Sequence, residues 1–183
     1  MKSIEDFKGT PMGDAMQELN QAMLDRSMPQ IELNVVGGFA MMLYGYRPPQ
    51  TETDIDYTGI DLPIDIKNIS SLIGQKYGLG TEWINNDLML SGITMEDFEL
   101  STGKLHFYPA FELEKIKINV IDEKDLLRLK LIALDTSLTA IELGGDFTRM
   151  KDIKDTVVLL KARGQSLDEA IAENSFYIRN KNI

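Results

Sequence analysis

The segment from Thr51 to Thr58 constrains the fold more than any other part of the sequence, because its side chains alternate between two chemical types. The odd-numbered positions are β-branched or aromatic, whereas three even-numbered positions are acidic, namely Glu52, Asp54 and Asp56. Successive side chains of a β-strand point to opposite faces, so this pattern predicts a strand with one core face and one acidic face. Asp54 and Asp56 are therefore expected to lie side by side.

Two neighbouring carboxylates repel each other unless a cation offsets their charge. Mg²⁺ suits such a pair, because it binds one or two protein carboxylates and completes its octahedron with water and substrate phosphates. We therefore interpret Asp54 and Asp56 as candidate metal ligands. The alternative interpretation is a polar strand face that is merely solvated.

A glycine pair precedes the acidic strand. Residues 32–36 predict a short buried strand, and residues 39–44 predict a helix that Gly45 and two following prolines end. Gly37 and Gly38 lie between these elements, where the missing side chains let a ligand approach the backbone amides. We expect a phosphate group to bind there, close to the two aspartates.

The glycine pair, a short helix and then Thr53-Asp54-Ile55-Asp56 together resemble the signature of the nucleotidyltransferase superfamily of the DNA polymerase β type. Within that superfamily the chain is similar to bacterial proteins related to the toxins of abortive-infection (type IV) toxin–antitoxin systems. Three later segments agree with this subgroup, namely Trp83–Asp87, Leu126–Ala133 and Arg149–Asp155. The resemblance thus covers roughly residues 31–163.

This resemblance implies an enzyme that moves a nucleoside monophosphate from a nucleoside triphosphate to an acceptor, with Mg²⁺ as cofactor. The implied acceptor is RNA or a protein side chain, and a cognate antitoxin is a further implied partner. Two alternatives stay open. The first is that the chain is a catalytically weak relative that binds nucleotide or a partner protein as a regulatory module. The second is that it is a structural protein that retains only the fold.

A third carboxylate is implied by the wider superfamily, on a later strand, where it completes the metal site. Asp87 is the first candidate, because the resemblance puts its segment on a neighbouring strand. Glu112 and Glu114 are the next candidates, since they are two residues apart and share one strand face. The alternative is that none of the three serves.

Lys130 and Arg149 are the candidate phosphate ligands of the C-terminal third. Lys130 interrupts an apolar helical run, where a lysine usually keeps its ammonium in water. The resemblance implies instead that Lys130 faces the cleft and contacts the triphosphate. Arg149 and Asp152 have the spacing of a surface pair on a helix, and the alternative is that Arg149 or Lys151 binds phosphate while Asp152 orients it.

Two further single residues have ordinary interpretations. Arg47 is expected to be a solvated loop residue, although its position would also let it neutralise the aspartates or a bound phosphate. His106 is the only histidine, which leaves little room for a histidine cluster, and we expect it to make a local hydrogen bond. The absence of cysteine excludes disulfides and thiolate chemistry.

The order of the elements predicts an α/β or α+β fold, with a mixed sheet flanked by helices as in nucleotidyltransferases and a C-terminal helical part. Further strands are expected at 104–108 and 115–121, and helices at 12–27, 64–77, 123–143, 150–162 and 167–174. We expect one domain over residues 1–183, with a sheet-containing core at 1–121 and helices at 122–183.

The net charge of −10 argues against broad electrostatic binding of nucleic acid. Residues 1–110 carry seven basic and sixteen acidic residues, whereas residues 111–183 carry twelve and thirteen. A polyanion is therefore expected on the C-terminal part, if one binds outside the catalytic site. The sequence shows no signal peptide and no apolar segment of membrane length, so we expect a cytoplasmic protein without membrane contact.

Overall fold

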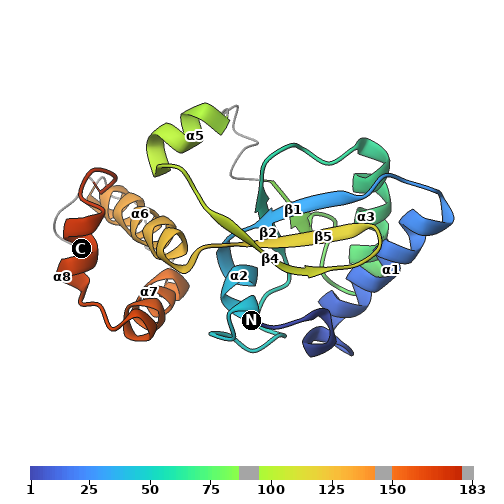
Figure 1. Ribbon diagram of the computed structural model, residues 1–183, viewed down its shortest axis with the longest axis horizontal. Helices are drawn as coiled ribbons and strands as arrows, with labels where there is room; N and C mark the ends of the chain where they lie inside the picture. Colours follow the sequence, from blue (N-terminus) through green and yellow to red (C-terminus); the bar gives the residue numbers. More distant parts are fainter. Residues whose placement is uncertain (87–94, 143–149, 179–183) are drawn as a thin grey trace. The chain divides into compact units, whose positions relative to one another are not determined.

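The computed structural model describes residues 1–86, 95–142 and 150–178, and they form an α+β fold (Figure 1). The strands are β1 (Ile31–Val35), β2 (Ile55–Thr58), β3 (Ile84–Asn85), β4 (Phe107–Glu112) and β5 (Ile116–Ile121). The helices are η1 (Ile4–Phe7, a 3₁₀-helix), α1 (Pro11–Asp25), α2 (Gly37–Leu43), α3 (Ile64–Lys76), α5 (Met95–Thr102), α6 (Glu123–Glu142), α7 (Met150–Arg163) and α8 (Leu167–Glu173).

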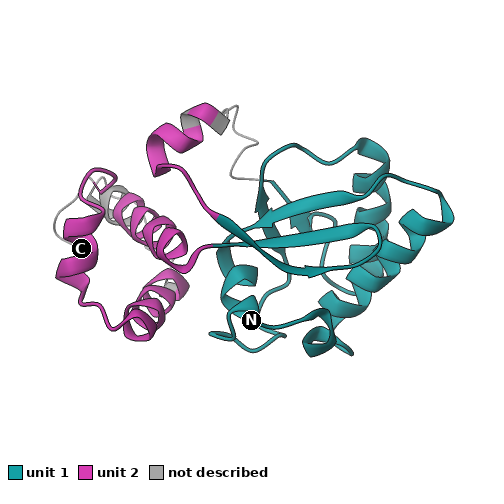
Figure 2. Ribbon diagram, viewed as in Figure 1, with its two compact units in different colours: residues 1–95, 107–121 teal, residues 96–106, 122–183 magenta. Residues whose placement is uncertain are grey.

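The chain divides into two compact units, which Figure 2 shows in different colours. Unit 1 comprises residues 1–95 and 107–121 and contains the sheet, whereas unit 2 comprises residues 96–106 and 122–183 and is helical. The expected helical part, residues 122–183, therefore belongs to unit 2. Unit 2 also contains residues 96–106, which precede β4. That the whole chain is one domain stays a prediction. Among the described helices, none combines the length and the apolar character that crossing a membrane requires.

The sheet of unit 1 has the strand order β3-β2-β1-β5-β4. Its central strand β1 pairs antiparallel with β2 and parallel with β5. Strand β3 runs parallel to β2, and β4 runs antiparallel to β5. The sheet is therefore mixed, as the sequence predicted.

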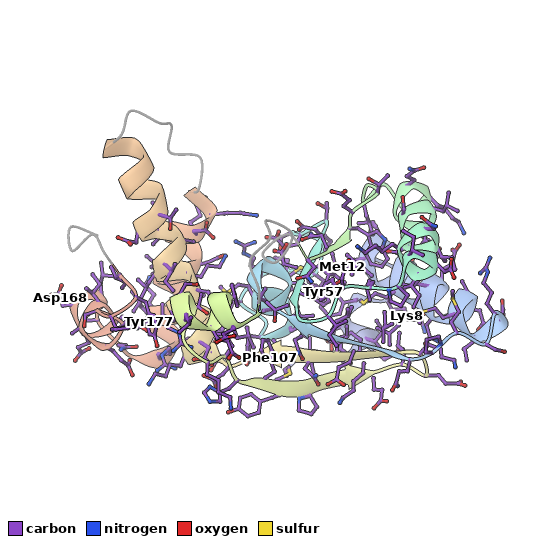
Figure 3. All side chains as sticks on the ribbon, turned by 90° about the horizontal axis from the view of Figure 1, so that it is seen from above. Lys8, Met12, Tyr57, Phe107, Asp168 and Tyr177 are labelled. Carbon is purple, nitrogen blue, oxygen red and sulfur yellow. The ribbon has the colours of Figure 1, made fainter. Side chains whose placement is uncertain are left out.

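One face of this sheet is apolar and fully enclosed. Its buried side chains alternate along the three inner strands, namely Ile31, Leu33, Val35, Ile55, Tyr57, Ile116, Ile118 and Val120. Helices α1 and α3 pack against each other and lie on one side of the sheet, as Figure 3 shows. Met12, Met16 and Met23 of α1 are buried, which confirms that the methionines of this helix are core residues.

The opposite face carries polar side chains. The Asn119 side-chain amide donates to Glu32 Oε1 at 2.5 Å and to Asn34 Oδ1 at 3.0 Å. Lys117 Nζ lies 3.0 Å from the same Glu32 oxygen. The hydrogen bond from Lys117, together with that from Asn119, holds the pKa of the Glu32 carboxyl below its usual range. Hydrogen-bonded polar groups thus occupy the side of β1 and β5 that faces away from the core.

The helix predictions are confirmed to within two residues. The carboxylate of Asp122 accepts a hydrogen bond from the backbone N–H of Lys124 at 2.8 Å, so Asp122 caps α6. Ser166 and Glu169 form a capping box at the start of α8. Local sequence signals therefore set these boundaries.

Two strand predictions differ from the structure. Strand β2 begins only at Ile55, because Thr51 is in a turn in which its N–H and hydroxyl both donate to the Pro48 carbonyl. Thr51 and Thr53 are accordingly exposed and do not face the core. The strand expected at 104–108 lies at Phe107–Glu112, where its hydrogen bonds to β5 place it.

Tyr57 gives the sheet a pH dependence on the alkaline side. Burial raises the pKa of its phenol to about 12, whereas an unfolded tyrosine ionises near ~10. The unfolded chain thus loses its proton first, so this contribution is complete below pH ~10 and is lost as the pH rises toward 12. We expect the difference in free energy of unfolding between wild type and Tyr57→Phe to shrink by up to about 3 kcal/mol over that range. Urea unfolding at both ends of the range measures it, and parallel pH profiles would contradict it.

Candidate functional site

The carboxyl end of β1 brings the glycine pair and the acidic strand together. The backbone N–H of Val36 donates to the Asp56 carbonyl at 2.9 Å, which continues the pairing of β1 with β2. A methyl group added to Gly37 would lie 2.5 Å from Asp56 Oδ2, so this carboxylate rests directly against the glycine. Gly37 also has a φ of +65°, a left-handed conformation that a side chain would strain. Both features require glycine at this position.

Asp56 lies on the face of β2 opposite the core side chains. Asp54 immediately precedes β2, and Ile55 and Tyr57 point into the core with exposed fractions of 0% and 2%. Both aspartates are half-buried, so their carboxylates are held by the sheet and still reach solvent. Within the described ranges no group of three or more acidic or histidine side chains could hold a metal ion. Two carboxylates are nevertheless a number that Mg²⁺ accepts from a protein.

Asn85 is the residue of β3 that lies beside the acidic pair. It stands directly opposite Asp56 in the parallel pairing of β2 with β3, so both side chains are on the same face. The sequence pattern singled out Asp87 in this segment, but Asp87 lies outside the described residues. Asn85 is identified by the register between β2 and β3. A sequence motif does not contain this information, because the register depends on how the strands pair. The Asn85 amide oxygen adds a third oxygen donor to this side of the sheet.

Glu112 and Glu114 are not candidates for the third carboxylate, contrary to the sequence analysis. Strand β4 ends at Glu112 and is separated from β2 by β1 and β5. The two strands are therefore three strand spacings apart, or roughly 14 Å in total. Glu112 is also opposite Lys117, at the amino end of β5, whereas Asp56 is at the carboxyl end of β1. Glu112 instead accepts a hydrogen bond from Gln30 at 2.8 Å. Glu114 follows in the turn after β4, at the same distant end.

Arg47 is not a solvated loop residue, which corrects the expectation for it. Its guanidinium forms an ion pair with Glu52, and the two side chains are only 14% and 8% exposed. The Glu52 carboxylate lies directly against Gly38, as shown by the distance of 2.4 Å that a methyl group added to Gly38 would have from Glu52 Cδ. Each glycine of the pair is therefore in contact with one carboxylate of the chain. Nothing in the sequence distinguished Glu52 from the neighbouring acids.

Lys130, the first candidate phosphate ligand of unit 2, is buried. Its ammonium lies 2.7 Å from Asp152 Oδ1 and 2.8 Å from Asp155 Oδ2. The exposed fractions of these three residues are 7%, 4% and 2%, so the cluster is enclosed between α6 and α7. The expectation that Lys130 keeps its ammonium in water is therefore wrong. A role for Lys130 in triphosphate binding stays a prediction.

Arg149 lies outside the described residues, so its expected role is not addressed by the structure. Its expected partner Asp152 is a buried partner of Lys130, and Lys151 is exposed. Asp152 is therefore not an exposed half of a surface pair.

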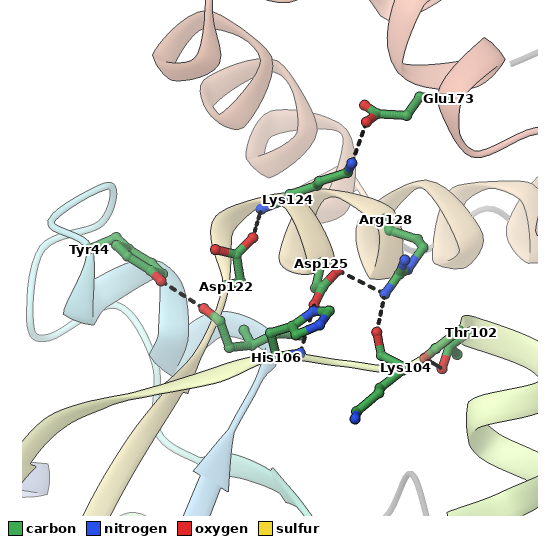
Figure 4. Close-up of polar contacts among 11 residues, drawn as sticks. Tyr44, Thr102, Lys104, His106, Asp122, Lys124, Asp125, Arg128 and Glu173 are labelled. Carbon is green, nitrogen blue, oxygen red and sulfur yellow. Dashed lines mark hydrogen bonds and ion pairs between the residues drawn. The ribbon is translucent and has the colours of Figure 1, made fainter.

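His106 makes a hydrogen bond, but its partner is not local in the sequence, because Asp125 lies 19 residues further along the chain. Its Nδ1 lies 2.9 Å from Asp125 Oδ2, and the same oxygen accepts a hydrogen bond from the His106 backbone N–H at 2.7 Å. Figure 4 shows these contacts. Arg128 donates to the other oxygen of Asp125 at 2.8 Å and to the Lys104 carbonyl at 3.0 Å. Asp125 thus ties the start of α6 to the segment before β4.

In unit 1 the structure brings Asp56 against Gly37 and opposite Asn85, and it places the ion pair of Arg47 and Glu52 against Gly38. Asp54 precedes Asp56 by two residues. Comparisons with protein-family models, with curated proteins and with solved structures returned no significant match. The function must accordingly be inferred from the chemistry of these residues.

Proposed function

We propose that this protein is a metal-dependent nucleotidyltransferase that moves a nucleoside monophosphate from a nucleoside triphosphate to RNA or to a protein side chain. The observation that supports the proposal most directly is the contact between the Asp56 carboxylate and Gly37 at the carboxyl end of β1. A nucleotide there would meet the glycine pair and neighbouring carboxylates at once. The resemblance to the nucleotidyltransferase superfamily, including the subgroup related to type IV toxins, agrees with this chemistry.

The donor set fits Mg²⁺. Asp54 and Asp56 are half-buried acids two residues apart, and Asn85 offers an amide oxygen on the same face as Asp56. Hard oxygen donors of this kind suit Mg²⁺, with water and phosphate oxygens taking the remaining positions. The cation would neutralise charge on the triphosphate during transfer. Asp54 and Asp56 would hold it, and the glycine pair would admit the phosphate chain to the backbone.

The transfer itself needs little covalent chemistry from the protein. A hydroxyl of the acceptor forms a bond to the α-phosphorus, the bond to the β-phosphate oxygen breaks, and pyrophosphate leaves. The acceptor proton passes to a carboxylate of the site or to water. Positioning by the rigid end of β1 and by β2 is then the main contribution of the chain.

A second candidate function is a nucleotide-binding or partner-binding regulatory module of weak or no activity. The position of Glu112 and Glu114 favours it, because neither can complete a three-carboxylate site. The polar residues that β5 contributes to the site face are Lys117 and Asn119, which are not acids. Asp87 stays the predicted third carboxylate. The enzyme requires this residue at the metal site, whereas the binding module does not.

Thermal denaturation with nucleotides tests the proposal. We expect ATP, GTP, CTP or UTP to raise the melting temperature of the wild type only when Mg²⁺ is present. A ligand at 100 times its dissociation constant adds ~2.7 kcal/mol to the stability of the folded state. Asp54→Ala is expected to lose the shift, because one carboxylate of the pair is gone.

The matched control is Glu112→Gln, which removes a carboxylate from the same unit at the distant end of the sheet. It is expected to keep the full shift. Transfer of label from α-labelled triphosphate to cellular RNA or protein then separates the enzyme from the binding module. A shift that is independent of Mg²⁺, or that survives in Asp54→Ala, would count against the metal site.

A further inference from the structure

Arg47 and Glu52 form an enclosed ion pair in the connection between α2 and β2, a position where charged side chains are usually solvated. The side chains are 14% and 8% exposed, so both charges have lost most of their contact with water. An enclosed ion pair contributes little to stability on average, because desolvation offsets the attraction between the charges. Stability alone therefore gives no reason for a charged pair at this place.

The position of Glu52 suggests another reason. Its carboxylate contacts Gly38, where an added methyl group would lie 2.6 Å from Oε1, while the Asp56 carboxylate contacts Gly37. The two carboxylates differ in their surroundings. Asp56 is half-buried, whereas Glu52 is buried and forms an ion pair with Arg47. The backbone at Gly38 is thus already in contact with an anion of the chain, held there by a cation.

We infer that Arg47 is a phosphate-binding residue of the site, and that the Glu52 carboxylate occupies the phosphate position until a triphosphate replaces it. The planar guanidinium of arginine binds carboxylate and phosphate oxygens with the same fork-like geometry, so one anion can replace the other. This inference rests on the proposed function, because it assigns the ligand of the same site. It adds a binding residue and a competing anion to the metal carboxylates.

The competition has a measurable consequence. A triphosphate must displace Glu52 before it reaches Arg47, so part of its binding free energy is used in breaking the ion pair. Glu52→Gln keeps the size and shape of the side chain and removes its charge. We expect this variant to bind ATP with Mg²⁺, and inorganic triphosphate with Mg²⁺, roughly tenfold more tightly than the wild type. Arg47→Gln is expected to weaken both roughly tenfold or more.

Isothermal titration with both ligands measures these affinities in the full chain. Because either variant breaks the ion pair, circular dichroism and thermal denaturation without ligand first establish that each is folded. The double variant Arg47→Gln with Glu52→Gln supplies a neutral pair, and we expect it to bind like Arg47→Gln. Glu112→Gln is the matched control, and it is expected to bind like the wild type.

The outcomes separate this inference from the proposed function. Wild-type affinity in Glu52→Gln, with a Mg²⁺-dependent shift that Asp54→Ala loses, would overturn the role of Glu52 and leave the metal site standing. Tighter binding in Glu52→Gln that survives in combination with Asp54→Ala would support the role of Arg47 and contradict the metal site. If neither the wild type nor Glu52→Gln binds a triphosphate, both fail.

Discussion

Replacing Lys130 by methionine is expected to lower the free energy of unfolding by about 3–5 kcal/mol, the usual cost of removing one partner from a buried ion pair. The ammonium lies within 2.8 Å of carboxylate oxygens of both Asp152 and Asp155, and each aspartate is at most 4% exposed. Methionine fills a similar volume, so the loss is electrostatic and leaves two enclosed acids without this cation. Chemical denaturation monitored by circular dichroism measures the change.

A compensating variant separates the charge effect from a packing effect. Combining Lys130→Met with Asp152→Asn and Asp155→Asn removes all three charges and is expected to recover much of the lost stability. The matched control is Lys154→Met, because Lys154 is an exposed lysine of α7. It is expected to change stability by less than about 0.5 kcal/mol. A wild-type stability for Lys130→Met would contradict the electrostatic role of this lysine.

Lys130 also illustrates what the sequence could not provide. The apolar run around it correctly predicted a helix, since periodicity is a local property. Its partners Asp152 and Asp155 belong to a different helix, and only the packing of α6 against α7 brings them to the ammonium. The helical spacing of Arg149 and Asp152 suggested a surface pair, whereas the structure has Asp152 buried against Lys130.

The site shows the same division between local and long-range information. Alternation of side chains correctly placed Ile55 and Tyr57 in the core and Asp56 on the other face, because a strand has a period of two. The alternation of side chains does not predict the order of the strands in the sheet. That order places Asn85 beside Asp56 and Glu112 three strands away. Likewise, the contact of Glu52 with Gly38 depends on how the chain turns between α2 and β2.

Asp56→Asn is expected to reduce metal-dependent nucleotidyl transfer by at least about 10- to 100-fold, the range found when even outer partners of a metal site are changed. Asp56 is the carboxylate that contacts Gly37, so it is placed to hold a cation next to a phosphate at the backbone. Asparagine keeps the shape of the side chain and its contact with the glycine, but it removes the negative charge. The variant should therefore fold normally and lose affinity for Mg²⁺. Initial rates with α-labelled triphosphate over a range of Mg²⁺ concentrations measure the effect.

Two comparisons make the result for Asp56→Asn specific. Gly37→Ala leaves both aspartates in place but adds a methyl group 2.5 Å from Asp56 Oδ2, at a residue with a left-handed backbone. It is expected to lower the same activity by displacing the carboxylate, and to destabilise the fold by about 1 kcal/mol or more. Glu32→Gln changes an acid on the same sheet face but at the amino end of β1, and its activity is expected to stay at the wild-type level. Equal losses in Glu32→Gln and Asp56→Asn would indicate a general effect of charge on this face, because a metal held at the carboxyl end of β1 requires Glu32→Gln to keep the wild-type activity.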